Sequence, residues 1–208
     1  RDVERSRGLG DVYKRQLIEA YLTGKELKTV AEIDASVSDL MTSARLYMYG
    51  LQFTYNPHRM ILNRVTDVYL LDADGNRREL EDDKLYRVVA DLYSGQMLSA
   101  VTKTSYGLLS VVPKKADGTP IENFEDVILT DNGGELKAWT AIAHYMESFP
   151  DENGDGIADI PQYYAGLHER KVVDDSANLI KLIKNPNKYA VMICLLYTSP
   201  SPRDLSTS

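Results

Sequence analysis

The sequence predicts an α+β fold, a mixed sheet with helices packed against it. A helical pattern covers residues 22–44, short β-prone runs follow, and two further helical patterns lie near the end of the chain. Segregation of helices and strands along the chain is typical of α+β domains, whereas regular alternation predicts a parallel α/β sheet.

The first helix is predicted from apolar residues at helical spacing, with Gly24 near its start: Leu27, Val30, Ala31 and Val37. Strands are predicted where the period shortens, over residues 46–49, 51–55, 63–70, 85–90 and 108–112. Asp74-Gly75 is a strong hairpin signal after the third run. The run 85–90 is expected to be a buried strand, and three tyrosines are expected to bury their rings and keep their hydroxyl groups in water: Tyr47, Tyr49 and Tyr55.

Two later helices are predicted, over residues 135–149 and 175–184. The first has an apolar face of Leu136, Trp139, Ala143 and Met146. Residues 131–134, with the sequence DNGG, are expected to supply its preceding turn and its N-cap.

The two ends of the chain are expected to have a different origin from the rest. One stretch of DNA, read on opposite strands, can encode both RGLGDVYKRQ at residues 7–16 and CLLYTSPSPR at residues 194–203. It resembles a transposase-end adaptor of sequencing libraries. We therefore expect residues 1–16 and 194–208 to be translated adaptor, and residues 17–193 to be one domain that is truncated at both ends.

Composition excludes some classes of function. The net charge is −7, and it becomes −9 without the two ends. An acidic chain without a basic run argues against nucleic-acid binding, which depends on neutralising phosphates. The single cysteine, Cys194, lies in the expected adaptor, so residues 17–193 contain no disulfide, thiolate metal site or cysteine nucleophile.

Three stretches together resemble a known family. They are LTGKELK from Leu22, LYMYGLQFTYNP from Leu46, and NRVTDVYLLDADGNRRELEDDKLYRVVADLY from Asn63 to Tyr93. In order, they are similar to the G-x-x-L helix start, the Q-V-S-G-L-R-F-T-Y-D strand, the N-R-V strand and the L-D-P-D-K-x-Y-x-V strand of the C-terminal domain of bacterial 5′-nucleotidases and bifunctional metallophosphatases. The resemblance covers residues 22–93 and implies the fold of that domain.

The resemblance also implies a division of labour. In this family an N-terminal metallophosphoesterase domain holds a pair of divalent metal ions and hydrolyses the phosphate ester. The C-terminal domain holds the nucleoside, with the base stacked between two aromatic rings. We therefore expect a nucleotide or nucleoside as ligand, a metallophosphoesterase domain in cis, and no catalytic residue on this chain.

The sequence departs from the family at the base-binding loop. After the Y-x-V strand the family has N-F/Y-L-x-x-G-G-D-G-F/Y, whose last aromatic residue stacks on the base. Here residues 91–97 read DLYSGQM, without G-G-D-G. The other stacking ring falls at or before Leu17. Tyr93 is the nearest substitute and our predicted substrate-binding residue; the alternative is a strand-end tyrosine packed on the core.

A loop at residues 151–159 has the spacing of a calcium loop. D-x-N-x-D-G-x-x-D predicts side-chain oxygen ligands from Asp151, Asn153, Asp155 and Asp159 and a backbone carbonyl from Ile157. Gln162 stands where an EF-type loop has a bidentate glutamate, which removes one charge. The alternative to a structural Ca²⁺ is a plain acidic turn.

Residues 178–193 end in a lysine-rich stretch followed by YAVMI, as at the edge of a membrane helix. A membrane anchor downstream of Ile193 is one interpretation, and an ordinary amphipathic helix is the other. We expect an extracellular or cell-surface protein: the nucleotide-binding domain of a 5′-nucleotidase-like hydrolase. The alternatives are a non-catalytic surface spacer or ligand-binding module on the same scaffold, and an unrelated periplasmic-type small-molecule binder.

Overall fold

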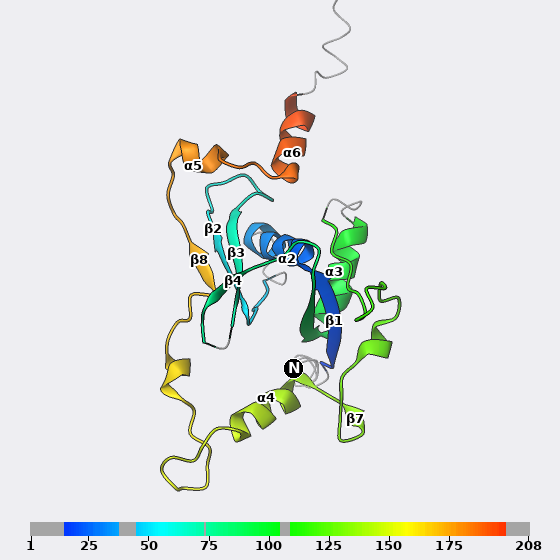
Figure 1. The fold of residues 1–208 in the computed structure, drawn as a ribbon, viewed down its shortest axis with the longest axis vertical. Coiled ribbons are helices and arrows are strands. Elements are labelled where there is room, and N and C mark those ends of the chain that lie inside the picture. Colours follow the sequence, from blue (N-terminus) through cyan, green and yellow to red (C-terminus); the bar gives the residue numbers. More distant parts are fainter. Residues whose placement is uncertain (1–14, 38–44, 73, 105–108, 199–208) are drawn as a thin grey trace, which may run out of the picture. The chain divides into compact units, whose positions relative to one another are not determined.

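The computed structural model describes residues 15–37, 45–72, 74–104 and 109–198 (Figure 1). The chain divides into two compact units, one of residues 1–26 and 82–168 and one of residues 27–81 and 169–208. Both units contain helices and strands, and the predicted α+β class is confirmed.

The first unit is built on β1 (Leu17–Thr23) and β5 (Leu85–Asp91), which pair antiparallel. Alternate residues of β1 are buried, and Ile18 packs into a core with Phe124. Val89 lies opposite Glu19, on the other face of the pair, and is 48% exposed. The strand at residues 85–90 is therefore confirmed, but the expectation that it is a buried strand is wrong.

The remaining elements of the first unit follow β5 in the sequence. They are α3 (Leu92–Thr104), η2 (Phe124–Val127), β6 (Thr130–Asp131), β7 (Gly134–Glu135), α4 (Ala138–Glu147) and η3 (Gln162–Ala165). Residues 109–112 form no strand, contrary to prediction, although Val111 is fully buried.

The turn predicted at residues 131–134 is present, but it does not cap the next helix. Asn132 and Gly133 adopt φ of 48° and 80° and connect β6 to β7. The N-cap of α4 is Lys137, which makes no side-chain capping bond. The predicted apolar face of α4 is not buried either, since Trp139 is 47% exposed and Met146 is 43% exposed.

The second unit contains a four-stranded sheet in the order β4–β3–β2–β8. Its strands are β2 (Leu51–Tyr55), β3 (Val65–Leu71), β4 (Arg77–Glu79) and β8 (Lys171–Val173). The sheet is mixed, as predicted, because β8 runs parallel to β2 while β2, β3 and β4 pair antiparallel. The predicted hairpin joins β3 to β4, and Gly75 adopts the positive φ of 79° that its turn requires.

The run at residues 46–49 is not a strand, and its tyrosine rings are not buried. Tyr47 is 89% exposed and Tyr49 is 81% exposed. A cation lies over each ring instead: Lys171 Nζ is 5.5 Å from the Tyr47 centroid, and Arg170 Cζ is 4.7 Å from the Tyr49 centroid. These cations hold the rings at the surface.

The helix α2 (Gly24–Val37) packs through small residues against the sheet of the second unit. Ala31 and Ala35 contact Phe53, which is 1% exposed. Their small side chains let the helix approach the sheet closely and cover this face of β2 and β3. The predicted apolar residues Leu27 and Val30 are also buried. Residues 38–44, the rest of the predicted helix, lie outside the described residues.

Polar side chains of α2 are buried as well, and each has a defined partner. Glu32 accepts hydrogen bonds from the backbone N–H of Arg64 (2.8 Å) and Val65 (2.9 Å) and from Ser36 Oγ (2.6 Å). Ser36 Oγ accepts one from the N–H of Leu62. A buried carboxylate is tolerated when it is fully hydrogen-bonded, so the helix fixes the loop that leads into β3.

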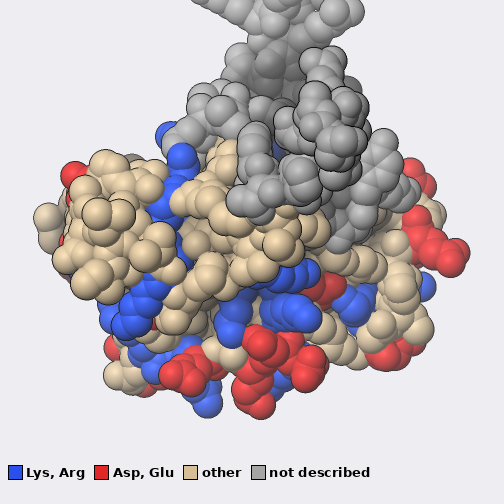
Figure 2. Space-filling view, turned by 90° about the horizontal axis from the view of Figure 1, so that it is seen from above, with Lys and Arg blue, Asp and Glu red and all other residues tan. Residues whose placement is uncertain are grey.

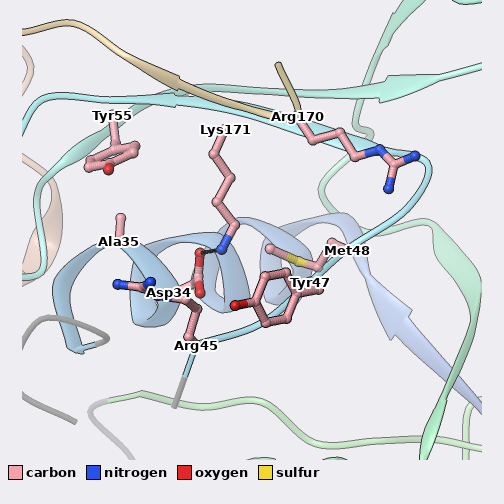
Figure 3. Close-up of a pocket in the computed structure, with 8 residues that line it drawn as sticks. All are labelled: Asp34, Ala35, Arg45, Tyr47, Met48, Tyr55, Arg170 and Lys171. Atoms are coloured by element: carbon pink, nitrogen blue, oxygen red, sulfur yellow. Dashed lines mark ion pairs between the residues drawn. The ribbon is translucent and has the colours of Figure 1, made fainter. Parts of the chain in front are cut away.

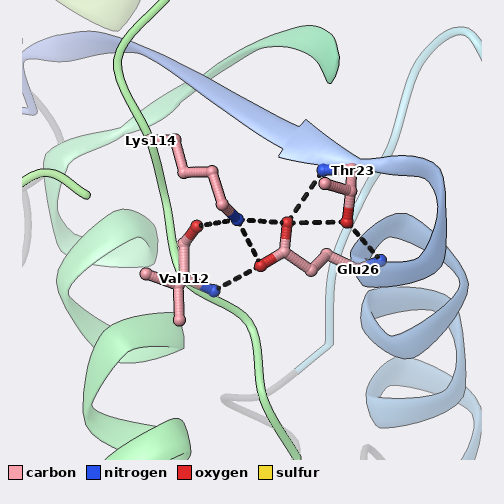
Figure 4. A network of polar contacts seen from close by, with 4 residues as sticks. All are labelled: Thr23, Glu26, Val112 and Lys114. Carbon is pink, nitrogen blue, oxygen red and sulfur yellow. Dashed lines mark hydrogen bonds and ion pairs between the residues drawn. The ribbon is translucent and has the colours of Figure 1, made fainter. Parts of the chain in front are cut away.

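The junction between β1 and α2 is held by Glu26 (Figure 4). Its carboxylate accepts hydrogen bonds from Thr23 N (2.8 Å) and Thr23 Oγ1 (2.9 Å), while Thr23 Oγ1 accepts one from Glu26 N, which forms a capping box. The same carboxylate accepts the N–H of Val112 at 3.0 Å and pairs with Lys114 Nζ at 2.6 Å. Glu26 is 9% exposed, so water screens this ion pair little.

Protonation of Glu26 is expected to weaken the fold. Burial favours the neutral acid, but Lys114 and the N–H groups of Thr23 and Val112 outweigh it and hold the pKa of Glu26 below its ordinary 4.5. A lowered folded-state pKa gives stability that is complete above about pH 4.5 and is lost as the pH falls through the folded value. Glu26→Gln should lower the free energy of unfolding by about 2 kcal/mol at pH 7 and reduce its fall towards pH 3, measured by urea denaturation. Exposed Glu125→Gln is the control; an unchanged pH profile in Glu26→Gln would contradict this role.

The C-terminal part of the second unit is tied down by Arg59. This 7%-exposed guanidinium donates hydrogen bonds to the carbonyl groups of Asn63 (2.6 Å), Lys181 (2.6 Å) and Lys184 (3.0 Å). The last two belong to the C-terminal end of α5 (Leu179–Ile183), where a positive charge is favourable. The helix predicted at residues 175–184 is confirmed in this shorter form. A further helix, α6 (Lys188–Thr198), follows, and no helix among the described residues is long and apolar enough to cross a membrane.

Removal of the Arg59 guanidinium should release this segment. Arg59→Met leaves the α5 carbonyl groups without their donor, and we expect a loss of about 2–3 kcal/mol. Hydrogen exchange of amides 181–185 should accelerate while exchange in β1 and β5 stays unchanged. Arg78→Met, on exposed β4, is the matched control, and equal exchange in both variants would rule out the clamp.

Candidate functional site

Tyr93 lies on the first turn of α3, immediately after β5. Its ring is 52% exposed, so it is not packed into the core. Asp91 fixes the helix start, because its carboxylate accepts hydrogen bonds from Ser94 N (3.0 Å) and Ser94 Oγ (2.6 Å). The sequence therefore places Tyr93 on a capped helix start, and its role in substrate binding stays a prediction.

Gly95 sets how closely this helix start approaches β1. A Cβ at Gly95 would lie 2.5 Å from Ile18 Cδ1 and 3.2 Å from Phe124 Cε1. A side chain there would push α3 away from the core. The glycine of the sequence DLYSGQM thus serves close packing, and not a flexible loop of the G-G-D-G kind.

The chain just before β1 runs beside Tyr93. The carbonyl of Gln16 accepts the N–H of Leu92 at 2.9 Å, and the Arg15 guanidinium lies 5.7 Å from the centroid of the Tyr93 ring. Both residues belong to the expected adaptor. Whatever residue the natural protein has at position 15, its side chain can face the Tyr93 ring from this point of the chain.

The loop at residues 151–159 is held by its own side chains. Asp151 accepts hydrogen bonds from the N–H groups of Gly154 (2.6 Å) and Gly156 (2.9 Å), and these donors hold its pKa below the usual range. Asp159 accepts two from Asn153, and Asp155 accepts the N–H of Ile157 at 2.8 Å. The predicted ligands thus lie on one turn-rich loop, and their binding of Ca²⁺ stays a prediction.

Each of the three histidines contacts a different residue, and these contacts do not bring the histidines together. His58 Nε2 lies 2.8 Å from Asp175 Oδ1, His144 Nδ1 lies 3.6 Å from Asp131 Oδ2, and His168 stacks on Tyr163 at 3.9 Å. Among the described residues, no three His, Cys, Asp or Glu side chains are arranged to hold a metal ion.

A cavity of about 420 Å³ opens in the second unit (Figure 3). It is lined by residues of α2, of the segment before β2, and of β2 and β8: Asp34, Ala35, Arg45, Tyr47, Met48, Tyr55, Arg170 and Lys171. Figure 3 shows Lys171 reaching from β8 and Asp34 from α2 so that their charged ends meet, 2.5 Å apart. This volume is within the range of small-molecule pockets.

Sequence reasoning did not find this cavity, because its residues come from parts of the chain that lie far apart in the sequence. One signal was available: Asp34 follows Val30 and Ala31 by four and three positions, so it lies on the predicted apolar face of the helix. A carboxylate in such a place needs a cation, and Lys171 supplies it from 137 positions along the chain. On the face drawn in Figure 2, Lys and Arg side chains lie among Asp and Glu and do not merge into one basic surface.

Comparison with known proteins finds one family model that is similar to part of the chain. The model of the 5′-nucleotidase, C-terminal domain, matches residues 11–101, and this match begins within the expected adaptor. No curated protein matches the chain.

Two solved structures show partial similarity. The 5′-nucleotidase precursor from Thermus thermophilus is 20% identical, with a TM-score of 0.49, over 78% of this chain and 26% of that chain. The NAD nucleotidase of Haemophilus influenzae is 23% identical, with a TM-score of 0.36, over 48% of this chain and 18% of that chain. The present chain therefore spans about a quarter or less of the length of these proteins. Over residues 11–101, less than half of its length, the chain is similar to the 5′-nucleotidase C-terminal domain family.

Proposed function

We propose that this chain is the nucleotide- or nucleoside-binding domain of a 5′-nucleotidase-like phosphoester hydrolase. The observation that carries the proposal is the family match over residues 11–101, which includes β1, α2, β2 to β5 and most of α3. The ligand is held here, and a metallophosphoesterase domain elsewhere in the protein holds the divalent metal pair and performs the hydrolysis. Two metal ions in such a domain would stabilise both the attacking and the leaving oxygen.

Tyr93 is the proposed base-binding residue. Its half-exposed ring on a fixed helix start can stack on a nucleobase, because every base offers a flat π-face. The chain that precedes β1 supplies the opposite wall, since residue 15 already lies over this ring. The two halves of a base sandwich thus come from adjoining ends of β1 and β5.

Location at the cell surface or outside the cell belongs to the same proposal, with a membrane anchor downstream of Ile193. It is supported by the lysine-rich stretch and the apolar YAVMI sequence at residues 178–193. The continuation of the natural sequence past Ile193 tests the anchor directly, because an apolar segment of about 20 residues is needed to span a bilayer.

Isothermal titration of adenosine, which carries no phosphate, into the chain tests the base site. We expect saturable binding with a Kd on the order of 1 mM, since only one stacking ring is native here. Tyr93→Ala should raise the Kd about five- to hundred-fold, which corresponds to a loss of about 1–3 kcal/mol of stacking. Tyr163→Ala removes a tyrosine of similar exposure, 58%, from the same unit and is the matched control. Equal affinities in the two variants would eliminate Tyr93 as the base-binding residue.

A non-catalytic surface spacer or ligand-binding module is the second candidate. The observation that favours it is the replacement of the family's G-G-D-G loop by DLYSGQM, which continues into α3. Absence of saturable nucleoside binding in the titration would support this candidate against the first.

We also propose a structural Ca²⁺ in the loop at residues 151–159. What supports it is the alternation of oxygen-bearing side chains at Asp151, Asn153 and Asp155, each of which already accepts a backbone N–H of the loop. Each carboxylate keeps further lone pairs for a cation. Without the bidentate glutamate, affinity should lie in the weak range of about 10⁻⁴–10⁻³ M.

Calcium should therefore stabilise the protein measurably. At about 10 mM Ca²⁺ we expect stabilisation of roughly 1.4–2.7 kcal/mol, which raises Tm by about 3–8 °C. Asp155→Asn should abolish the increase, whereas Asp117→Asn, in an acidic turn elsewhere, should preserve it. The same shift with Mg²⁺, or in Asp155→Asn, would refute a specific calcium loop.

A further inference from the structure

The cavity of the second unit carries an inference that goes beyond the proposed function. We propose that it is a separate binding site for a small organic anion with a flat ring, such as an aromatic phosphate. It is built from α2, residues 45–48, β2 and β8, whereas Tyr93 belongs to the other unit. It therefore does not depend on the proposed nucleoside site.

The centre of the cavity is an ion pair that is already satisfied. Asp34, with a side chain 3% exposed, accepts the N–H of Leu46 at 2.7 Å and pairs with Lys171 Nζ. Lys171 Nζ also donates to the carbonyl of Leu46 at 2.6 Å. These contacts fix the wall that residues 45–48 form, so the cavity has a defined shape before any ligand binds.

The charge of the lining selects an anion. Arg45, Arg170 and Lys171 contribute three positive charges against the one carboxylate of Asp34, although the whole chain has a net charge of −7. Lys171 is engaged with Asp34, but Arg45 and Arg170 have no carboxylate partner among the described residues. Figure 3 shows their guanidinium groups on opposite sides of the ion pair. A guanidinium binds phosphate or carboxylate through paired N–H donors.

The uncharged residues that line the cavity favour a ligand with a flat ring. Tyr47 and Tyr55 present aromatic surface, and Met48 and Ala35 present apolar surface. Tyr47 is 89% exposed, and Lys171 Nζ lies 5.5 Å from its ring centroid. Because the Tyr47 ring is open to solvent, a flat ligand ring that stacks on it gains both aromatic contact and removal from water. The cavity of about 420 Å³ accommodates one ring and one acidic group.

Titration calorimetry with three probes separates the two elements of recognition. Phenyl phosphate has the ring and the anion, benzyl alcohol has only the ring, and inorganic phosphate has only the anion. We expect saturable binding of phenyl phosphate with a Kd on the order of 1 mM, and at least about tenfold weaker binding of each partial probe. Lack of saturation by phenyl phosphate at about 20 mM would overturn the proposal.

Variants then assign the binding to this cavity. Arg45→Gln and Tyr47→Ala change exposed side chains and should not affect folding, and each should weaken phenyl phosphate binding about five- to tenfold. Arg78→Gln, an exposed arginine on β4, and Tyr93→Ala should leave it unchanged. Undiminished binding in Arg45→Gln and Tyr47→Ala overturns the proposal, as does loss of binding in Tyr93→Ala, which would assign the ligand to the nucleoside site. Failure of adenosine binding alone leaves this result intact.

Discussion

The carboxylate of Glu26 is the contact on which the first unit depends. It closes the capping box at the end of β1, accepts the N–H of Val112 and neutralises Lys114. Lys114 in turn exchanges two backbone hydrogen bonds with Tyr21 along the edge of β1. One buried charge thus joins the end of a strand, the start of a helix and a segment 86 residues further along the chain, so β1 is held on both edges.

The proposed base site inherits its position from this arrangement. β1 pairs with β5 so that Leu17 faces Asp91, and the start of α3 therefore lies beside the beginning of β1. Gly95 permits the close approach to Ile18, and Asp91 caps the helix that presents Tyr93. Where the resembled family has a glycine-rich loop, this chain has a helix start capped by Asp91. In the proposed base site, this helix start presents one ring, and the chain before β1 lies on the opposite side.

In the second unit, buried charged residues likewise bind backbone groups, and these contacts fix the irregular segments around the sheet. Glu32 holds the loop that enters β3, Asp34 holds the segment before β2, and Arg59 holds the end of α5. Each of these charges is satisfied largely by backbone groups, which fixes the path of irregular segments that have little apolar surface of their own. The cavity lies where the segment before β2 meets α2 and the start of β8.

Local pattern determined the elements that need only short-range information. The sequence alone predicted α2, β2, β3, the Asp74-Gly75 hairpin, β5 and α4, because periodicity and turn chemistry act within a few residues. It also contained the resemblance that the family match confirms.

Long-range contacts decided the rest. Lys171 of β8 and the preceding Arg170 lie over the exposed rings of Tyr47 and Tyr49. Leu109 and Val111 are buried without strand pairing, beside the Val112 N–H that Glu26 binds. Which side chains meet in the cavity, and which face of α4 is left uncovered, depend on packing between segments over 100 residues apart, and no local pattern encodes that.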